Sequence, residues 1–368
     1  MKAEIALKLL ADVMEWSAEQ ATKEFARLAL MARLKYDDYR DFLAGMRFLE
    51  SLVAWLQQFE PSERATAYQF VRERLIYVSA AERERLVALL FSRHIWPRLA
   101  KSAAAAAGVP EWRVLAEPAA VKALERERRS TLFLGLSDGA RLDSFRHLNE
   151  RTIRNEQVVV GVQLDKAKWQ DLVKKLRAEL ADAAAFFTRV VLVDDFTASG
   201  TSFLRKEEDG WTGKLKRFTD SIYEQGITVP GCELQVHHLM GTPKARAYLN
   251  ENGAAFLGQQ TERNAWIGKI EFTFSHLLGE EVPLSPSREA DAAFCALTQK
   301  YYNDELQTEH TEKGGVKHLG LGYAGCALPV VLDHNTPNNS VPLLWAQTDA
   351  TGDKVAMRPL FRRRQRHA

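Results

Sequence analysis

The spacing of apolar residues predicts a helical region at the start of the chain. Up to about residue 108, apolar positions recur at helical intervals, and Gly45 is the only glycine before Gly108. Phe42, Met46 and Leu49 belong to one such stripe. We therefore expect four to six packed helices in this region. The arginines and glutamates between the stripes form either a solvated face or a surface that binds a partner.

Two local signals mark helix starts within this region. Pro61-Ser62-Glu63-Arg64 begins a helix that we expect to carry apolar residues as far as Ile76. Ser79-Ala80-Ala81-Glu82 is a capping-box signature for a further helix, which extends to about His94. Five alanines before Gly108-Val109-Pro110 indicate the end of a helix and a domain boundary.

From about residue 111 the pattern changes to short apolar runs that alternate with amphipathic segments. This alternation is typical of βαβ units and of a parallel sheet with right-handed crossovers, so the region is expected to be α/β. The expected strands cover residues 131–136, 158–162, 189–193, 232–239 and 267–274, and the expected helices cover residues 142–148, 166–182, 213–225 and 242–250.

The chain after residue 275 is less regular. We expect a helix over 286–302, a loop over 309–315 and a strand over 327–332. The polar segment 333–340 then separates two apolar runs, and it forms either a long turn or a loop that faces a ligand. The basic tail from Arg358 onward forms either a frayed, solvated terminus or a contact with nucleic acid or a partner.

Composition bears on which partners and which cellular compartment we expect for this chain. The formal net charge of the 368 residues is +2, which gives no overall electrostatic reason to expect nucleic acid as a partner. Cys232, Cys295 and Cys326 show neither paired spacing nor a zinc pattern, which favours a reducing cytoplasm. No secretory signal and no apolar run of membrane-spanning length is visible, so we expect a cytoplasmic protein without a membrane partner.

The stretch 189–202 carries the chemistry around which the rest of the chain is interpreted. An apolar run leads into Asp194 and Asp195, and then into a turn of small and hydroxyl-bearing residues. The backbone N–H groups of residues 198–202 and their hydroxyls suit a phosphate group, because small side chains let an anion approach the backbone. The two carboxylates suit the hydroxyls of a neighbouring ribose, with Mg²⁺ offsetting their charge. The alternative is an ordinary strand with an acidic turn.

Residues 190–202 resemble the PRPP-binding motif of type I phosphoribosyltransferases, in which an apolar strand is followed by Asp-Asp and a small-residue turn. The resemblance implies a parallel-sheet core of that fold between an N-terminal all-helical domain and a C-terminal α+β hood. It implies that Asp194 and Asp195 are the catalytic pair, which contact the ribose hydroxyls and reach Mg²⁺ through water. The residues implied to bind the 5-phosphate of PRPP are Thr197, Ala198, Ser199, Gly200, Thr201 and Ser202.

The same resemblance implies a pyrophosphate loop after the first strand of the sheet. The matching residues are Ser137, Asp138, Gly139, Ala140 and Arg141, although an ordinary strand-to-helix turn has the same composition. The chain departs from the family pattern in three ways. The glycine pair of this loop is absent, the charged stretch 206–210 follows the phosphate turn, and no base-specific sequence is visible near the C-terminus.

The layout of the whole chain resembles the phosphoribosyltransferase-like proteins associated with bacterial conflict systems, which are encoded with anti-phage modules and often beside an ATPase. This implies a helical domain over 1–108, the core over 109–275 and the hood with its basic tail over 276–368. It also implies a partner ATPase or other defence protein at the helical domain and nucleic acid at the tail. The candidates for acceptor recognition are Asp333, His334, Asn335, Asn338 and Asn339, although His334 also suits a hydrogen-bonded turn.

Three functions therefore stay open on the sequence alone. The first is a PRPP-dependent effector that transfers a phosphoribosyl group to, or removes one from, a nucleotide or nucleic acid. The second is a catalytically silent nucleotide-binding module that regulates an anti-phage complex. The third is an interaction protein that docks a partner through its helical region or its basic tail.

Overall fold

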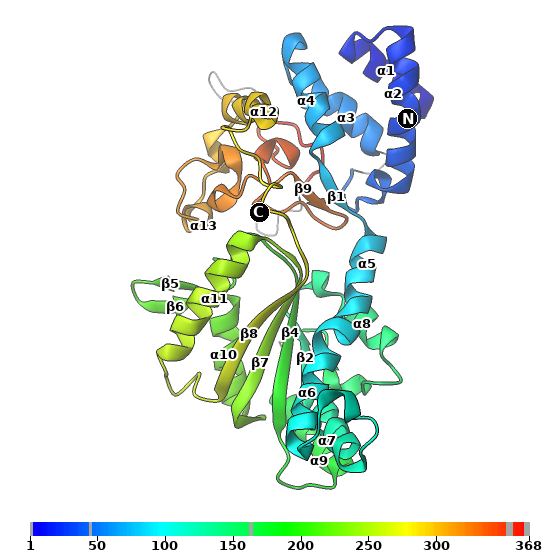
Figure 1. The fold of residues 1–368 in the computed structure, drawn as a ribbon. Coiled ribbons are helices and arrows are strands. Elements are labelled where there is room, and N and C mark those ends of the chain that lie inside the picture. Colours follow the sequence, from blue (N-terminus) through cyan, green and yellow to red (C-terminus); the bar gives the residue numbers. More distant parts are fainter. Residues whose placement is uncertain (1–2, 44–45, 162–164, 351–355, 364–368) are drawn as a thin grey trace. The chain divides into compact units, whose positions relative to one another are not determined.

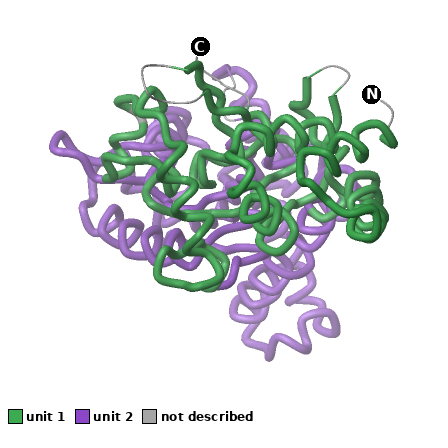
Figure 2. Tube along the Cα trace, turned by 90° about the horizontal axis from the view of Figure 1, so that it is seen from above, with its two compact units in different colours: residues 1–82, 280–368 green, residues 83–279 purple. Residues whose placement is uncertain are grey.

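The structure is a computed structural model that describes residues 3–43, 46–161, 165–350 and 356–363. Contacts group the chain into two compact units, which Figure 2 distinguishes by colour: residues 1–82 with 280–368 form unit 1, and residues 83–279 form unit 2. The three-domain division expected from the sequence stays a prediction. The compact units follow other boundaries, because the helices from residue 83 onward belong with the sheet and the two ends of the chain share one unit.

A five-stranded, wholly parallel sheet forms the centre of unit 2 (Figure 1). Its strand order is β3-β2-β4-β7-β8, so β2 and β4 are neighbours although β3 lies between them in the chain. The α/β fold expected from the alternating pattern is confirmed. The strands are β2 (Thr131–Gly135), β3 (Val158–Val159), β4 (Phe187–Thr197), β7 (Thr228–Gly241) and β8 (Ile267–Leu277).

Helices cover both faces of this sheet. Because side chains alternate along a strand, Val190 and Leu192 of β4 share a core with α9, α10 and α11, whereas Val191 and Val193 share another with α6, α7 and α8. The first set is α9 (Lys166–Leu180), α10 (Lys214–Gln225) and α11 (Pro243–Gly258), and the second set is α6 (Trp96–Ala107), α7 (Pro118–Arg129) and α8 (Leu142–Leu148).

The capping box expected at residue 79 is present at the start of α5 (Ala80–Leu89). The Ser79 N–H donates to the Glu82 carboxylate at 2.8 Å, and the Glu82 N–H donates back to the Ser79 hydroxyl at 3.3 Å. The helix expected to reach His94 continues as a π-helical turn, η2 (Leu90–Ile95), before α6 begins. Short 3₁₀ turns complete unit 2: η3 (Glu111–Arg113), η4 (Asp138–Ala140) and η5 (Asn155–Gln157).

Unit 1 combines the N-terminal helices with the C-terminal region. Its core joins residues as distant in sequence as Trp55 and Leu343, since the indole N–H of Trp55 donates to the Leu343 carbonyl at 2.7 Å. Its longer elements are α1 (Ala3–Met14), α2 (Ala18–Leu34), α3 (Phe48–Leu56), α4 (Pro61–Glu73), β1 (Ile76–Val78), α12 (Glu289–Lys300), α13 (Glu309–Glu312) and β9 (Val330–Leu332). Five 3₁₀ turns accompany them: η1 (Tyr36–Asp38), η6 (Asp304–Leu306), η7 (Leu319–Leu321), η8 (Tyr323–Gly325) and η9 (Pro342–Leu344).

Two expectations for unit 1 were wrong. The helix that starts at Pro61 ends at Glu73, and Ile76 lies instead in strand β1, which pairs in parallel with β9. The segment expected to be a loop over 309–315 begins with the short helix α13, which Thr308 caps by accepting a hydrogen bond from the Thr311 N–H. Within the described residues, no helix is both long enough and apolar enough to span a membrane.

The basic tail is anchored as far as the structure describes it, so the alternative of a frayed terminus was wrong for residues 358–363. Phe361 is fully buried, its N–H donates to the Leu344 carbonyl at 2.8 Å, and its ring packs against Tyr36, Tyr39 and Phe48. The apolar pair Leu360 and Phe361 holds this segment in the core of unit 1. The rest of the expected tail, residues 364–368, lies outside the described residues.

We expect Phe361→Ala to lower the free energy of unfolding by about 3 to 5 kcal/mol, because the change removes a buried aromatic ring from the core. Urea denaturation followed by tryptophan fluorescence measures this loss. The neighbouring exposed residue supplies the control, and Arg362→Ala is expected to change stability by less than about 0.5 kcal/mol. Equal effects of the two substitutions would contradict the anchoring role of Phe361.

Candidate functional site

Strand β4 carries the sequence motif to the carboxyl edge of the sheet. The strand is longer than expected and continues through Asp194 and Asp195 to Thr197. Because residues of a strand alternate, the two carboxylates leave β4 on opposite faces. The turn 198–202 follows directly at the carboxyl edge, which is where open parallel sheets bind their ligands.

Asp194 is held by an ion pair that the sequence analysis did not anticipate. Its carboxylate is only 2% exposed and lies 2.6 Å from the ammonium group of Lys214, the first residue of α10. Burial raises the pKa of Asp194, while the Lys214 ammonium and the Ser137 hydroxyl oppose this rise. Lys214 therefore limits the rise in the pKa that burial imposes on Asp194.

The turn 198–202 has the donor set that a phosphate group requires. Among the described residues, the backbone N–H groups of Ser199, Gly200 and Ser202 donate no hydrogen bond. The hydroxyls of Ser199 and Thr201 hydrogen-bond to each other at 2.9 Å and line the same turn. Ser202 is exposed, so the turn is open to solvent at this end. These groups fit the prediction that the turn binds a phosphate, which stays a prediction.

Two contacts hold the turn in this conformation. Gly200 has a φ of 79°, and a Cβ atom added to it would lie 2.8 Å from the ring of Tyr248, so only glycine fits without displacement. The Thr242 hydroxyl donates to the Ala198 carbonyl at 2.6 Å and also caps α11. The fold therefore positions the turn before any ligand binds.

The charged stretch expected to interrupt the helix behind the turn forms a hairpin of β5 (Arg205–Glu207) and β6 (Gly210–Thr212). After this hairpin the chain returns to the turn, and the N–H groups of Lys214 and Leu215 donate to the carbonyls of Ser202 and Phe203. The first two N–H groups of α10 are thus engaged within the protein. The insertion also places Lys214 beside Asp194.

The structure brings the predicted pyrophosphate loop to the motif. The Ser137 hydroxyl donates to the Asp195 carboxylate at 3.3 Å. Because β2 and β4 are adjacent only through a change in strand order, this meeting point is a topological switch point of the sheet. Gly139 and Ala140 lie in η4 directly behind Ser137.

The predicted diphosphate contact, Arg141, already has partners inside the protein. Its guanidinium lies 2.6 Å from the Glu84 carboxylate and 3.4 Å from that of Asp143. A buried arginine that the sequence analysis missed, Arg83, supports the loop by donating to the Gly139 carbonyl at 3.3 Å. The helical pattern gave no signal for Arg83, because charged residues between apolar stripes are usually solvated.

His238 is a second buried residue that the sequence analysis missed. It stands opposite Asp194 in the β4–β7 register and packs against the rings of Phe203 and Phe274. Burial, together with the charge of Lys214, lowers the pKa of His238 to about 3. The ring is therefore neutral at physiological pH, and its two nitrogens have no hydrogen-bond partner among the described residues.

The carboxylate of Asp195 suits a metal ion that arrives with a substrate. Within the described part of the chain, no group of three or more His, Cys, Asp or Glu side chains could hold a metal ion. Mg²⁺ commonly keeps most of its water and is held by one or two carboxylates and substrate phosphates. The half-buried carboxylate of Asp195 at the sheet edge suits that mode of binding.

The predicted acceptor residues lie in unit 1, whereas the motif lies in unit 2. Asp333 and Asn339 are buried: the Asp333 backbone bonds to Val78 and Arg40, and the Asn339 amide donates to the Tyr323 carbonyl. His334, Asn335 and Asn338 are half-buried, and the Leu332 N–H bonds to the Asn335 carbonyl in a tight turn after β9. These contacts fit the turn alternative, and the acceptor role of this segment stays a prediction.

We expect the stability loss caused by Lys214→Met to depend on pH. Without the ammonium, the raised pKa of buried Asp194 rises further, so the folded protein keeps a proton that the unfolded chain releases as the pH increases. The free energy of unfolding must then decrease as the pH rises from the ordinary pKa of an aspartate to the raised pKa of Asp194. Because Lys214 is itself one-third exposed, we expect a loss of about 2 kcal/mol at pH 8 and a smaller one at pH 5.

Urea denaturation at both pH values measures this difference. The matched control is the double variant Asp194→Asn/Lys214→Met, which has no charge to lose and should show no such pH dependence. An equal loss at pH 5 and pH 8 for Lys214→Met would show that Lys214 does not limit the rise in the pKa of Asp194.

Comparisons with known proteins agree with the geometry of the motif. The comparison with curated proteins found no match to this chain, and neither did the comparison with solved structures. A family model described as PRTase-CE matches residues 52–363, which covers all of unit 2, part of unit 1 and every site residue discussed above. The sheet, the switch point and this match lead to one conclusion: the chain belongs to the PRTase-CE family, the phosphoribosyltransferase-like proteins associated with conflict systems.

Proposed function

We propose that the chain binds PRPP at the carboxyl edge of its sheet and transfers the phosphoribosyl group to an acceptor. The observation that carries this proposal is the turn 198–202, whose backbone N–H groups at Ser199, Gly200 and Ser202 are not engaged within the described residues. An anion that accepts from such N–H groups gains several charge-assisted hydrogen bonds at once. The 5-phosphate of PRPP is the group that we assign to this turn, with Thr197, Ala198 and Thr201 completing it.

The ribose then extends from the turn toward Asp195. Its hydroxyls would donate to the Asp195 carboxylate, which is half-buried and close to Ser137. The diphosphate would lie against the loop 137–141, where the backbone N–H of Gly139 takes the place of Arg141, because that arginine is engaged by Glu84 and the Ala140 N–H by the Ser137 carbonyl. The predicted roles of Asp138 and of Arg141 itself stay predictions.

Asp194 has a different proposed role in this arrangement. Its ion pair with Lys214 fixes the start of α10 beside the turn, so Asp194 acts first as a positioning residue. Direct contact of Asp194 with the ribose, as expected from the motif, requires the carboxylate to exchange the ammonium for substrate hydroxyls. Mg²⁺, when bound with PRPP, would neutralise diphosphate charge and favour its departure.

The transfer step breaks the bond between C1′ and the diphosphate oxygen and forms a bond from C1′ to a nucleophile of the acceptor. Positive charge develops on the ribose ring as the diphosphate leaves. The residues of this chain fix the sugar at both ends, through the turn and through Asp195, which holds C1′ in a constant position. The negative charge of Asp195 favours the positively charged ring in the transition state.

The wider role that we propose is that of a cytoplasmic defence effector that acts on a nucleotide or nucleic acid. This rests on the association of the family with conflict systems. The N-terminal helices and the basic segment from Arg358 remain our candidates for contacts with a partner ATPase and with nucleic acid. The segment 333–339 remains the candidate for acceptor recognition.

Specific observations favour a second candidate function, a nucleotide-binding module without turnover. Lys214 forms an ion pair with Asp194 of the motif, and Glu84 forms one with Arg141 of the predicted pyrophosphate loop. A module of this kind would bind PRPP but release no pyrophosphate. Detection of pyrophosphate after incubation with PRPP, Mg²⁺ and a purine, a pyrimidine or RNA would reject this candidate in favour of the transferase.

We expect Asp195→Asn to weaken PRPP binding by at least about tenfold, because a neutral amide accepts weaker hydrogen bonds from the ribose than a carboxylate does. Isothermal titration with PRPP in the presence of Mg²⁺ measures the affinity. Asp209→Asn is the matched control, since it removes the same charge from the exposed end of the hairpin and should leave the affinity unchanged. Absence of PRPP binding in the parent protein would reject the proposed function.

A further inference from the structure

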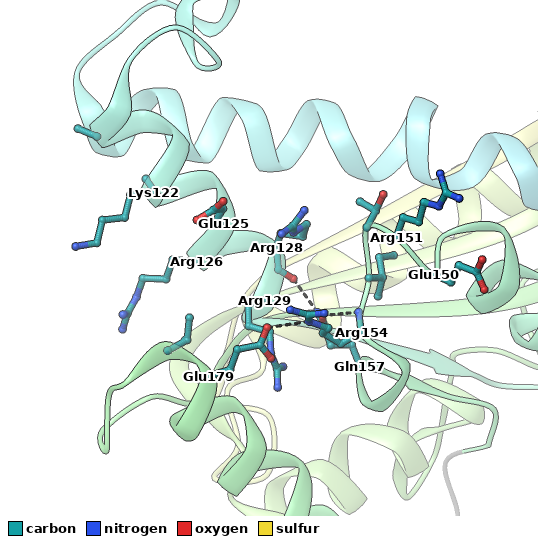
Figure 3. Close-up of a pocket in the computed structure, with 15 residues that line it drawn as sticks. Lys122, Glu125, Arg126, Arg128, Arg129, Glu150, Arg151, Arg154, Gln157 and Glu179 are labelled. Carbon is teal, nitrogen blue, oxygen red and sulfur yellow. Dashed lines mark hydrogen bonds and ion pairs between the residues drawn. The ribbon is translucent and has the colours of Figure 1, made fainter.

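Unit 2 contains a second site at the opposite edge of its sheet. A hollow of about 620 Å³ lies where the chain enters β2, β3 and β4, and it is lined by α7, by residues 150–157 and by the end of α9 (Figure 3). The motif lies at the other end of β4, whose 11 residues span roughly 30 Å. The hollow is therefore separate from the proposed PRPP site.

The lining of this hollow is strongly basic. Of the described residues, three acidic side chains line it, namely Glu125, Glu150 and Glu179, so that cations outnumber acids by two to one. The cationic lining residues are Lys122, Arg126, Arg128, Arg129, Arg151 and Arg154.

Part of this positive charge is already neutralised. Arg126 pairs with Asp182, and Arg154 pairs with Glu179 at 3.0 Å. In contrast, Lys122, Arg128 and Arg151 form no ion pair within the described part of the chain. Figure 3 shows Arg128 and Arg151 on different segments of the lining. The hollow thus brings together cations that lack counter-charges.

Arg129 supplies the observation that points to a ligand. Its side chain is 5% exposed, and its Nε donates to Glu179 at 2.5 Å while Nη2 donates to Glu156 at 3.4 Å. Its third nitrogen, Nη1, is buried and has no hydrogen-bond partner among the described residues. A buried guanidinium nitrogen without an acceptor is costly, and an anion in the hollow would satisfy it.

We propose that this hollow binds a small ligand that carries two or more adjacent phosphate groups. Arginine recognises phosphate through paired hydrogen bonds, and the volume lies in the usual range for a small-molecule site. Among the described residues, no aromatic side chain lines the hollow, so these residues offer no surface on which successive bases of a nucleic-acid strand would stack. The recognised part of the ligand is its phosphate chain, as in an oligophosphate or a nucleoside polyphosphate.

Isothermal titration of the full chain with sodium tripolyphosphate tests this proposal. The protein carries Ser202→Glu, which places a negative charge in the proposed 5-phosphate turn and thereby removes binding there. We expect one saturable binding event, weakened at least tenfold by the added changes Arg128→Ala and Arg151→Ala. Arg93→Ala, which removes an exposed arginine outside the hollow, is the matched control and should leave the affinity unchanged.

Circular dichroism and thermal melting establish that each variant is folded. If the double change unfolds the protein, Arg151→Ala alone replaces it, because that side chain is exposed. Unchanged affinity after loss of these arginines, or no binding of tripolyphosphate, would overturn the proposal. It would also be overturned if a 20-nucleotide single strand bound through Arg128 and Arg151 while tripolyphosphate did not, which would assign the hollow to nucleic acid. None of these outcomes depends on PRPP binding.

Discussion

The arrangement of the proposed site depends on strand β4, which is hydrogen-bonded to a parallel neighbour on each side. Its pairing with β2 brings Ser137 to Asp195, and its pairing with β7 places neutral His238 beside Asp194. The alternation of the strand gives the two adjacent carboxylates different surroundings. One is buried against a lysine, and the other is half-buried at the sheet edge. Identical residue types thus acquire different proposed roles from their position on one strand.

The sequence predicted the centre of the fold more fully than its periphery. Each of the five strands of the main sheet was expected, because apolar runs of this kind between amphipathic helices are a strong local pattern. The pairing of β1 with β9 was not expected, since each strand has only three residues and the partners lie more than 250 positions apart. Likewise, the burial of Phe361 follows from a tertiary contact that no local pattern in a basic tail reveals.

The candidate site was likewise predicted only in part from the sequence. The motif from Asp194 to Ser202 was visible because its residues are consecutive in the sequence. Lys214 was not recognised, because a lysine in the first turn of an amphipathic helix ordinarily faces solvent, and only the hairpin β5–β6 returns it to the motif. The basic hollow arises from three separate segments, so its arginines show no spacing pattern that sequence analysis could detect.

The proposed function depends on the turn after β4, which we propose holds the phosphate of a phosphoribosyl group. A crystal structure of the full chain with PRPP and Mg²⁺ is the decisive measurement. We expect the 5-phosphate within hydrogen-bonding distance of the backbone N–H groups of Ser199, Gly200 and Ser202, with the ribose hydroxyls at Asp195. PRPP bound elsewhere in the molecule, with these N–H groups turned away from any phosphate, would rule out this role of the turn.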